Sequence, residues 1–100
     1  MGEPRSAEEI QGEIDRLKEM KPTVRRFDTF GGDNHAKIDA ELDVLEERMD
    51  EDEIYDRWSD EDDPEINYDL ISSARYAMAW MMGDEEDPPS KGWEALVEKT

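Results

Sequence analysis

The side chains best suited to chemistry in this sequence are carboxylates, and they are concentrated in one part of the chain. Between Asp39 and Asp69, 16 of 31 residues are Asp or Glu, and only Arg48 and Arg57 oppose them. On a helix this density gives roughly one charge per 3 Å, against about 3.4 Å between phosphates along one DNA strand. Such a surface suits a basic groove built for nucleic acid. The competing interpretation is a solvated face that confers solubility.

The charge is divided unevenly along the chain. Residues 1–37 carry a net charge of −1 and residues 38–100 a net charge of −17, which together give −18. A charge of this size repels itself in a compact protein and repels nucleic acid and anionic membranes. We therefore expect a basic partner, with no direct binding to nucleic acid and no membrane association. Residues 1–37 are interpreted as a near-neutral scaffold and residues 38–100 as the acidic region.

Catalytic and metal sites find little support in the residue pattern. The single His35 has no serine or cysteine nucleophile that would mark a triad, and the chain contains no cysteine. An EF-hand loop needs glycine at its sixth position, whereas loops starting at Asp50 and Asp60 have Tyr55 and Glu65 there. We expect no enzyme activity, no catalytic residue, no metal site and no cofactor.

The elements that must position the carboxylates follow from helical spacing and capping signals. Ser6 with Glu9 resembles a capping box, and Pro22 disfavours helix at the residue before it. Asp50 with Glu53 forms a similar pair, and Asp63 before Pro64 is the predicted cap of the fourth helix. The predicted helices are residues 6–20, 34–49, 50–58, 64–82 (ended by Gly83) and a short last helix capped by Ser90.

Apolar side chains at these spacings predict a folded protein. The second half of the fourth helix, ISSARYAMAWMM, is the most apolar stretch and is expected to be central to the core. Phe27 and Phe30 are expected under their loop, and Arg25 and Arg26 are expected to pair with the protein's own carboxylates. The fold class is therefore all-α: a compact bundle of three to five helices with acidic outer faces, forming a single helical domain over 1–100.

The sequence also bears on location. The N-terminal residues lack an apolar signal segment, and no apolar run reaches the roughly 20 residues that a membrane span needs. The absence of cysteine fits a reducing compartment. We expect a cytoplasmic protein.

One part of the chain resembles known proteins. The segment VRRFDTFGGDNHAKIDAELDVLEERMDEDEIYDRW (24–58), with the later PPSKGWEALV, resembles small uncharacterised proteins encoded by bacterial phages, plasmids and other mobile elements, over about half of the chain. In charge, size and helicity the whole chain also resembles DNA-mimic inhibitors, namely anti-CRISPR proteins, anti-restriction proteins and uracil-DNA glycosylase inhibitors. Together these resemblances imply an inhibitor of host nucleic-acid-binding enzymes, acting in the cytoplasm of a bacterial host cell.

The resulting hypothesis is DNA mimicry directed at a basic nucleic-acid-binding protein. A CRISPR–Cas effector is the first expected target and a restriction enzyme the second. Tyr55 and Trp58 could each serve as an interface hot spot or belong to the core. The predicted partner-binding residues are Glu46, Glu47, Asp50, Glu51, Asp52, Glu53, Asp56, Asp60, Glu61, Asp62 and Asp63, with Asp84, Glu85, Glu86 and Asp87 extending the surface.

An alternative from another functional class is a helical adaptor or assembly protein. Its apolar face would bind a partner helix or a second copy of the chain, and Met-rich surfaces adapt well to partners. A homodimer could also extend the acidic surface. This alternative requires partial exposure of Ala77, Met78, Trp80, Met81 and Met82.

Overall fold

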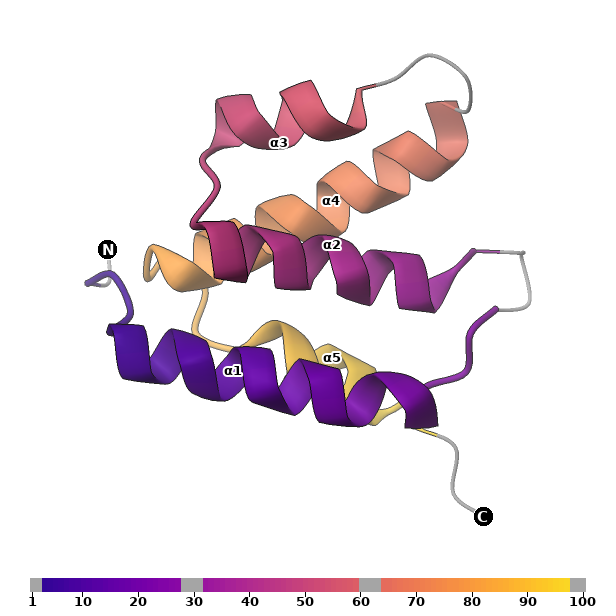
Figure 1. Cartoon of the computed structure of the whole chain (residues 1–100), viewed down its shortest axis with the longest axis horizontal. Coiled ribbons are helices and arrows are strands. Elements are labelled where there is room, and N and C mark those ends of the chain that lie inside the picture. Colours follow the sequence, from indigo (N-terminus) through magenta and orange to yellow (C-terminus); the bar gives the residue numbers. More distant parts are fainter. Residues whose placement is uncertain (1–2, 28–31, 60–63, 98–100) are drawn as a thin grey trace.

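The computed structural model describes residues 3–27, 32–59 and 64–97, with the backbone alone for 64–67. Over these residues the chain forms α1 (Ala7–Met20), α2 (Asn34–Glu47), α3 (Glu51–Trp58), α4 (Pro64–Met81) and α5 (Pro89–Glu94) (Figure 1). A short 3-10 helix, η1 (Lys21–Thr23), follows α1. No strand occurs in the described part, where extended pairing is limited to two isolated bridges. The all-α prediction is confirmed.

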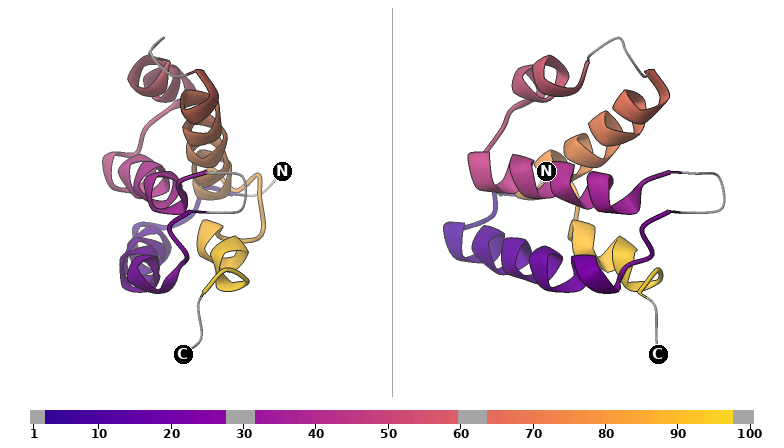
Figure 2. Two further views of the ribbon diagram at one scale, coloured as in Figure 1. Left: turned by 90° about the vertical axis from the view of Figure 1, so that its right-hand side faces the viewer. Right: turned by 45° about the vertical axis from the view of Figure 1, so that its right-hand side comes forward.

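Helix α2 occupies the centre of the bundle. It lies between α1 on one side and α3 on the other, while α4 lies behind it and α5 lies behind α1 (Figures 1 and 2). Its residues Ile38, Val44 and Leu45 are fully buried. The second half of α4, which was expected to be central, supplies Ala74 and Trp80 to the same core. The core therefore forms where α2 meets both α1 and α4, because α2 confines most of its acids to one face.

Two helices begin where the sequence predicted. The Ser6 hydroxyl accepts the backbone N–H of Glu9 at 3.2 Å and caps α1. At α3 both halves of a capping box form, because the Asp50 carboxylate accepts the Glu53 amide at 2.9 Å and the Glu53 carboxylate accepts the Asp50 amide at 3.5 Å. These bonds satisfy amides that a helix start leaves without partners.

The helix ends also follow backbone chemistry. Helix α1 ends at Met20, and Pro22 lies in η1 directly after it. Helix α2 is two residues shorter than predicted because Arg48 takes a left-handed conformation with φ 54°. Gly83, at φ 89°, follows α4 as expected, since glycine adopts this conformation without steric cost. The predicted cap Asp63 lies outside the described residues.

The loop between α1 and α2 corrects one expectation. Phe27 is 54% exposed rather than tucked under the loop, and the Arg26 guanidinium lies over its ring at 5.0 Å. A cation held over the ring lets the aromatic side chain stay at the surface. Phe30 lies outside the described residues. Arg26 also pairs with Asp33 at 3.5 Å, which confirms for this arginine that it pairs with a carboxylate of its own chain.

Candidate functional site

The predicted acidic surface lies around the junction of α2 and α3. Glu46 and Glu47 are exposed at the end of α2, and Asp52 and Asp56 are exposed along α3. Helix α3 carries four acids and one arginine over eight residues, a length of about 12 Å. The structure therefore brings together the part of the surface that runs from residue 46 to residue 56. Residues 60–63 lie outside the described part.

Basic side chains of the protein itself neutralise part of this surface. Arg57 of α3 binds Glu47 of α2 through two N–H···O bonds of 2.7 and 2.8 Å and lies 3.5 Å from Asp43. The hydrogen bonds from Arg57, and its positive charge, lower the pKa of Glu47. The pKa of Asp43 is raised, mainly by burial. These pairs join α3 to α2 and reduce the free charge of the α2 face.

Two further pairs reach the same surface from other helices. Lys18 of α1 lies 3.5 Å from Glu46, and Arg75 of α4 lies 3.9 Å from Glu51. Asp52 and Asp56, by contrast, form no ion pair with any described residue. These two aspartates of α3 therefore keep their negative charge available to a partner.

The two aromatic residues of α3 take different positions. Tyr55 is 40% exposed and has the Arg75 guanidinium over its ring at 5.9 Å. Trp58 is half-buried against the core, with Arg57 at 5.7 Å from its ring. Tyr55 is thus the aromatic side chain that the acidic surface presents.

Residues 84–87, which were predicted to extend the partner-binding surface, lie in the loop between α4 and α5. Contacts from Arg5 hold this loop in place. The Arg5 guanidinium donates to the carbonyl oxygens of Trp80 at 3.1 Å and Glu85 at 2.7 Å, and it lies over the Trp80 ring at 5.1 Å. The start of α3 and the end of α4 lie at the same end of the molecule, on the left of Figure 1. Of the four acids, Asp87 pairs with Lys91 at 3.2 Å.

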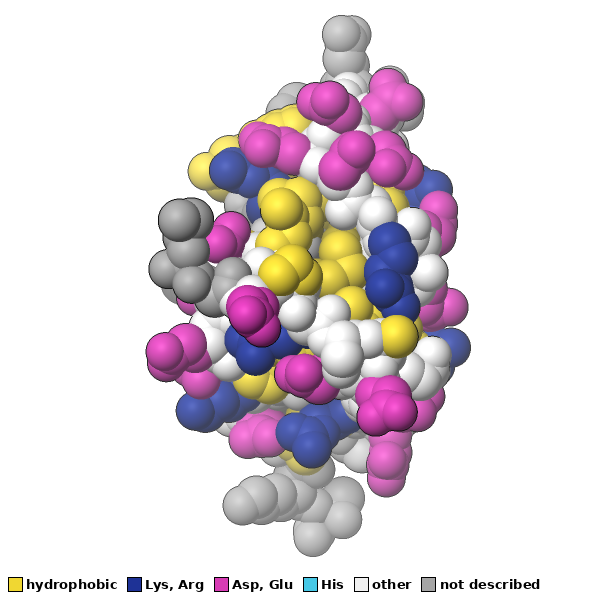
Figure 3. Space-filling model, turned by 90° about the vertical axis from the view of Figure 1, so that its left-hand side faces the viewer, with side chains coloured by type: hydrophobic (Ala, Val, Ile, Leu, Met, Phe, Trp, Pro, Cys, Tyr) yellow, Lys and Arg dark blue, Asp and Glu magenta, His cyan; other side chains and the backbone are white. Residues whose placement is uncertain are grey.

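That end of the molecule also carries apolar side chains. In Figure 3 they gather near the middle of the face, with carboxylates above them at the level of α3. Met82, directly after α4, is 50% exposed, and Met78 and Met81 are half-buried. Ala77 and Trp80 are buried, so the partial exposure that the adaptor alternative requires is wrong for these two residues.

Two buried carboxyl groups form a second set of polar residues that sequence reasoning missed. Glu13 of α1 is 5% exposed, and it accepts the Ser90 amide at 2.7 Å and the Ser90 hydroxyl at 2.9 Å. Ser90 was expected to cap the last helix. Instead it lies inside α5, where Glu13 from another helix accepts its amide, because α5 begins at Pro89 and has no side-chain cap of its own.

The second buried carboxyl belongs to Glu41 of α2. It is 4% exposed, and one of its oxygens accepts the indole N–H of Trp93 at 2.7 Å. Burial, with a smaller contribution from the charge of Glu13, raises the pKa of Glu41 to about 8. Burial also raises the pKa of Glu13, against the two hydrogen bonds from Ser90 that lower it. At neutral pH Glu41 is therefore mostly a neutral carboxylic acid.

A sequence signal for these groups does exist. Glu13 lies between Ile10 and Ile14 on the apolar side of α1, and Glu41 follows Ile38 by three residues on α2. An acid at such a position is directed toward the core. In a chain with 30 acids, two at inward positions do not stand out.

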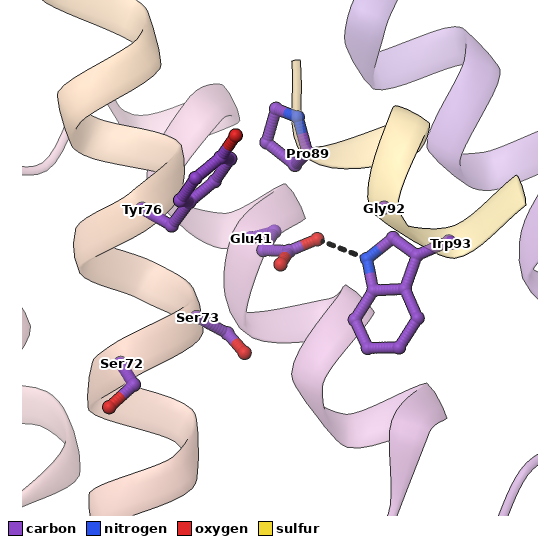
Figure 4. A pocket seen from close by; sticks show the side chains of 7 residues that line it. All are labelled: Glu41, Ser72, Ser73, Tyr76, Pro89, Gly92 and Trp93. Carbon is purple, nitrogen blue, oxygen red and sulfur yellow. Dashed lines mark hydrogen bonds between the residues drawn. The ribbon is translucent and has the colours of Figure 1, made fainter. Parts of the chain in front are cut away.

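Glu41 also lines a pocket of about 340 Å³ between α2, α4 and α5. Its other lining residues are Ser72, Ser73, Tyr76, Pro89, Gly92 and Trp93 (Figure 4). The Tyr76 hydroxyl donates to the Asp87 carbonyl at 2.9 Å, and burial is the main cause that raises the pKa of Tyr76. The pocket is thus mainly apolar and aromatic, with a single carboxyl group.

Other classes of site are not seen in the described residues. His35 is used structurally, with its Nε2 2.8 Å from the carbonyl oxygen of Val24. No group of three or more potential ligands among the described side chains is placed to hold a metal ion. Within the same residues, no helix is long and apolar enough to cross a membrane.

Comparison of the chain with protein-family models, with curated proteins and with solved structures finds no match. A proposal about its function therefore depends on the residues and on the geometry described above.

Proposed function

We propose that the chain inhibits a basic nucleic-acid-binding protein by occupying its nucleic-acid groove, with α3 and the end of α2 as the contact surface. The observation that carries the proposal is the concentration of charge. Residues 38–100 carry a net charge of −17. Within this region, Asp52 and Asp56 on the outer face of α3 form no ion pair with a described residue. Counterions and water released from the partner's groove would favour the complex, as they favour DNA binding.

A bacterial defence complex is the target class that we propose first. A CRISPR–Cas effector would make the chain an anti-CRISPR protein, and a restriction enzyme would make it an anti-restriction protein. Both targets hold DNA in a positively charged channel, whose charge is opposite in sign to that of an acidic helix and therefore attracts it. Tyr55, exposed beside these carboxylates, is the aromatic side chain placed to act as an anchor at the centre of such an interface.

The test measures DNA binding by purified CRISPR–Cas effectors and restriction endonucleases, with and without a stoichiometric amount of the chain. Inhibition of one of them is expected, and the affinity should fall steeply with salt, because exposed charges are screened. Inhibition that is insensitive to salt would contradict mimicry of the DNA backbone. Sedimentation of the chain alone checks the adaptor alternative, which requires self-association or an apolar partner.

The capping box limits which charges can be reversed without damage to the fold. Asp50 and Glu53 hold the start of α3, so the informative variant is Asp52→Lys with Asp56→Lys. Its matched control is Glu8→Lys with Glu19→Lys, which changes the net charge equally on exposed positions of α1. The first variant should lose inhibition and the control should keep it. Equal loss of inhibition in both variants would show that the total charge of the protein causes inhibition, and not the surface of α3.

A further inference from the structure

The pocket around Glu41 has the composition of a site for an organic cation. Tyr76 and Trp93 stand on either side of the Glu41 carboxyl group, and the Ser73 side chain projects from α4 below it in the view of Figure 4. Aromatic faces attract cations, and the attraction is larger where water is excluded. A volume of about 340 Å³ lies at the lower end of ligand pockets, so it suits a small group.

The carboxyl group has one oxygen available to a ligand. Oε1 is occupied by the Trp93 indole N–H at 2.7 Å, and the other oxygen faces the space between Tyr76 and Ser73 in Figure 4. The indole bond holds the carboxyl group in place before any ligand arrives. A cation entering the pocket therefore meets a fixed acceptor among mostly apolar side chains.

We propose that this pocket binds a guanidinium group on a short apolar stem, with the guanidinium against Glu41 and the stem between Tyr76 and Trp93. A guanidinium is planar, stacks on aromatic rings and presents five N–H donors. The net charge of −18 favours the approach of a cation over that of an anion. This inference is independent of the proposed inhibition and concerns a different face of α2.

Binding should displace a proton, because the cation needs the carboxylate form of Glu41. Burial is the main cause that raises the pKa of Glu41 to about 8, and the charge of Glu13 from α1 adds to it. The Trp93 indole from α5 and Lys37 from α2 act in the opposite direction. Burial raises the pKa of the Tyr76 hydroxyl of α4, so this group stays neutral at the pH values considered. Affinity should thus increase about 15-fold from pH 6.5 to pH 8, and about twofold more before it levels off.

The experiment follows the Trp93 indole N–H by NMR during titration with acetyl-arginine amide, using acetyl-citrulline amide as the neutral isostere. Saturable shifts are expected for arginine only, with the affinity rising with pH as above. Glu41→Gln should abolish the saturable shift, whereas Glu46→Gln, an exposed position on the same helix, should preserve it. Equal binding of citrulline, or no saturable shift of the Trp93 indole N–H with arginine, would overturn the proposal.

Two arms separate the possible sources of the guanidinium. Propylguanidinium represents a free small molecule, and a peptide with one arginine between glycine and serine residues represents a partner's side chain. Binding of either ligand to the pocket supports the proposed site. The ligand that binds more tightly identifies the source of the guanidinium group. If Glu41→Gln does not fold by circular dichroism, the pH dependence in the wild-type chain decides, since an affinity that is constant between pH 6.5 and 8 overturns the proposal.

Discussion

Replacement of Glu41 by glutamine should change how the stability of the protein depends on pH. The pKa of Glu41 is about 8 in the folded chain, against an ordinary value of 4.5. Between these two values the folded chain holds a proton that the unfolded chain has released. Stability must therefore fall as pH rises through this interval and recover as pH decreases.

The size of the effect follows from the difference between the two pKa values. Each pH unit costs about 1.4 kcal/mol of unfolding free energy, so that the whole interval costs about 5 kcal/mol. Glutamine has nearly the same shape, can still accept the Trp93 indole N–H, and does not titrate. The variant should lose this slope, so wild type and Glu41→Gln should differ most near pH 8, with the variant more stable.

The assay is urea unfolding followed by helical circular dichroism at several pH values between 5 and 8.5. A smaller slope should remain in the variant, because burial also raises the pKa values of Glu13 and Asp43. The matched control Glu46→Gln changes the same charge at an exposed position of α2 and should keep the wild-type slope. Parallel pH profiles for wild type and Glu41→Gln would refute the assignment of a buried, protonated carboxyl group.

Three further substitutions test the contacts that hold the helices together. Glu13→Ala leaves the buried Ser90 amide unpaired and should cost about 2–3 kcal/mol in urea unfolding, with a smaller loss for Glu13→Gln, which keeps an acceptor. Asp50→Ala removes the cap of α3 and should cost about 1 kcal/mol, whereas Asp50→Ser should restore most of it; equal stabilities would show that the cap contributes nothing. Arg5→Met frees the loop after α4 and should speed hydrogen exchange of residues 84–87 about tenfold, an effect absent from Arg16→Met.

Helix boundaries could be predicted from this sequence because they depend on local chemistry. The Ser6 and Asp50 caps, the stop before Pro22 and the turn at Gly83 each involve residues within four positions of one another. Such signals act in the same way in most surroundings. The all-α fold followed from them together with the spacing of the aliphatic side chains.

The buried carboxyl groups could not be predicted in the same way, because their partners are distant in the chain. Ser90 lies 77 residues from Glu13, and Trp93 lies 52 residues from Glu41. Their inward helical positions are a weak local signal, and their burial is decided only when α5 packs against α1 and α2. For a similar reason the sequence does not show which surface acids are already paired. The ion pairs of Arg57 and Arg75 depend on how the helices pack.

The contacts of Arg5 have a consequence for the order in which the chain can fold during synthesis. Its guanidinium binds a carbonyl oxygen 80 residues further on, and Glu13 of the first helix bonds to Ser90. Neither contact can form before residues 85–90 have been synthesised and have left the ribosome. Contacts of such high sequence separation slow folding. We expect α1 to be able to pack against α2 earlier, but to complete its native contacts only after α5 has emerged.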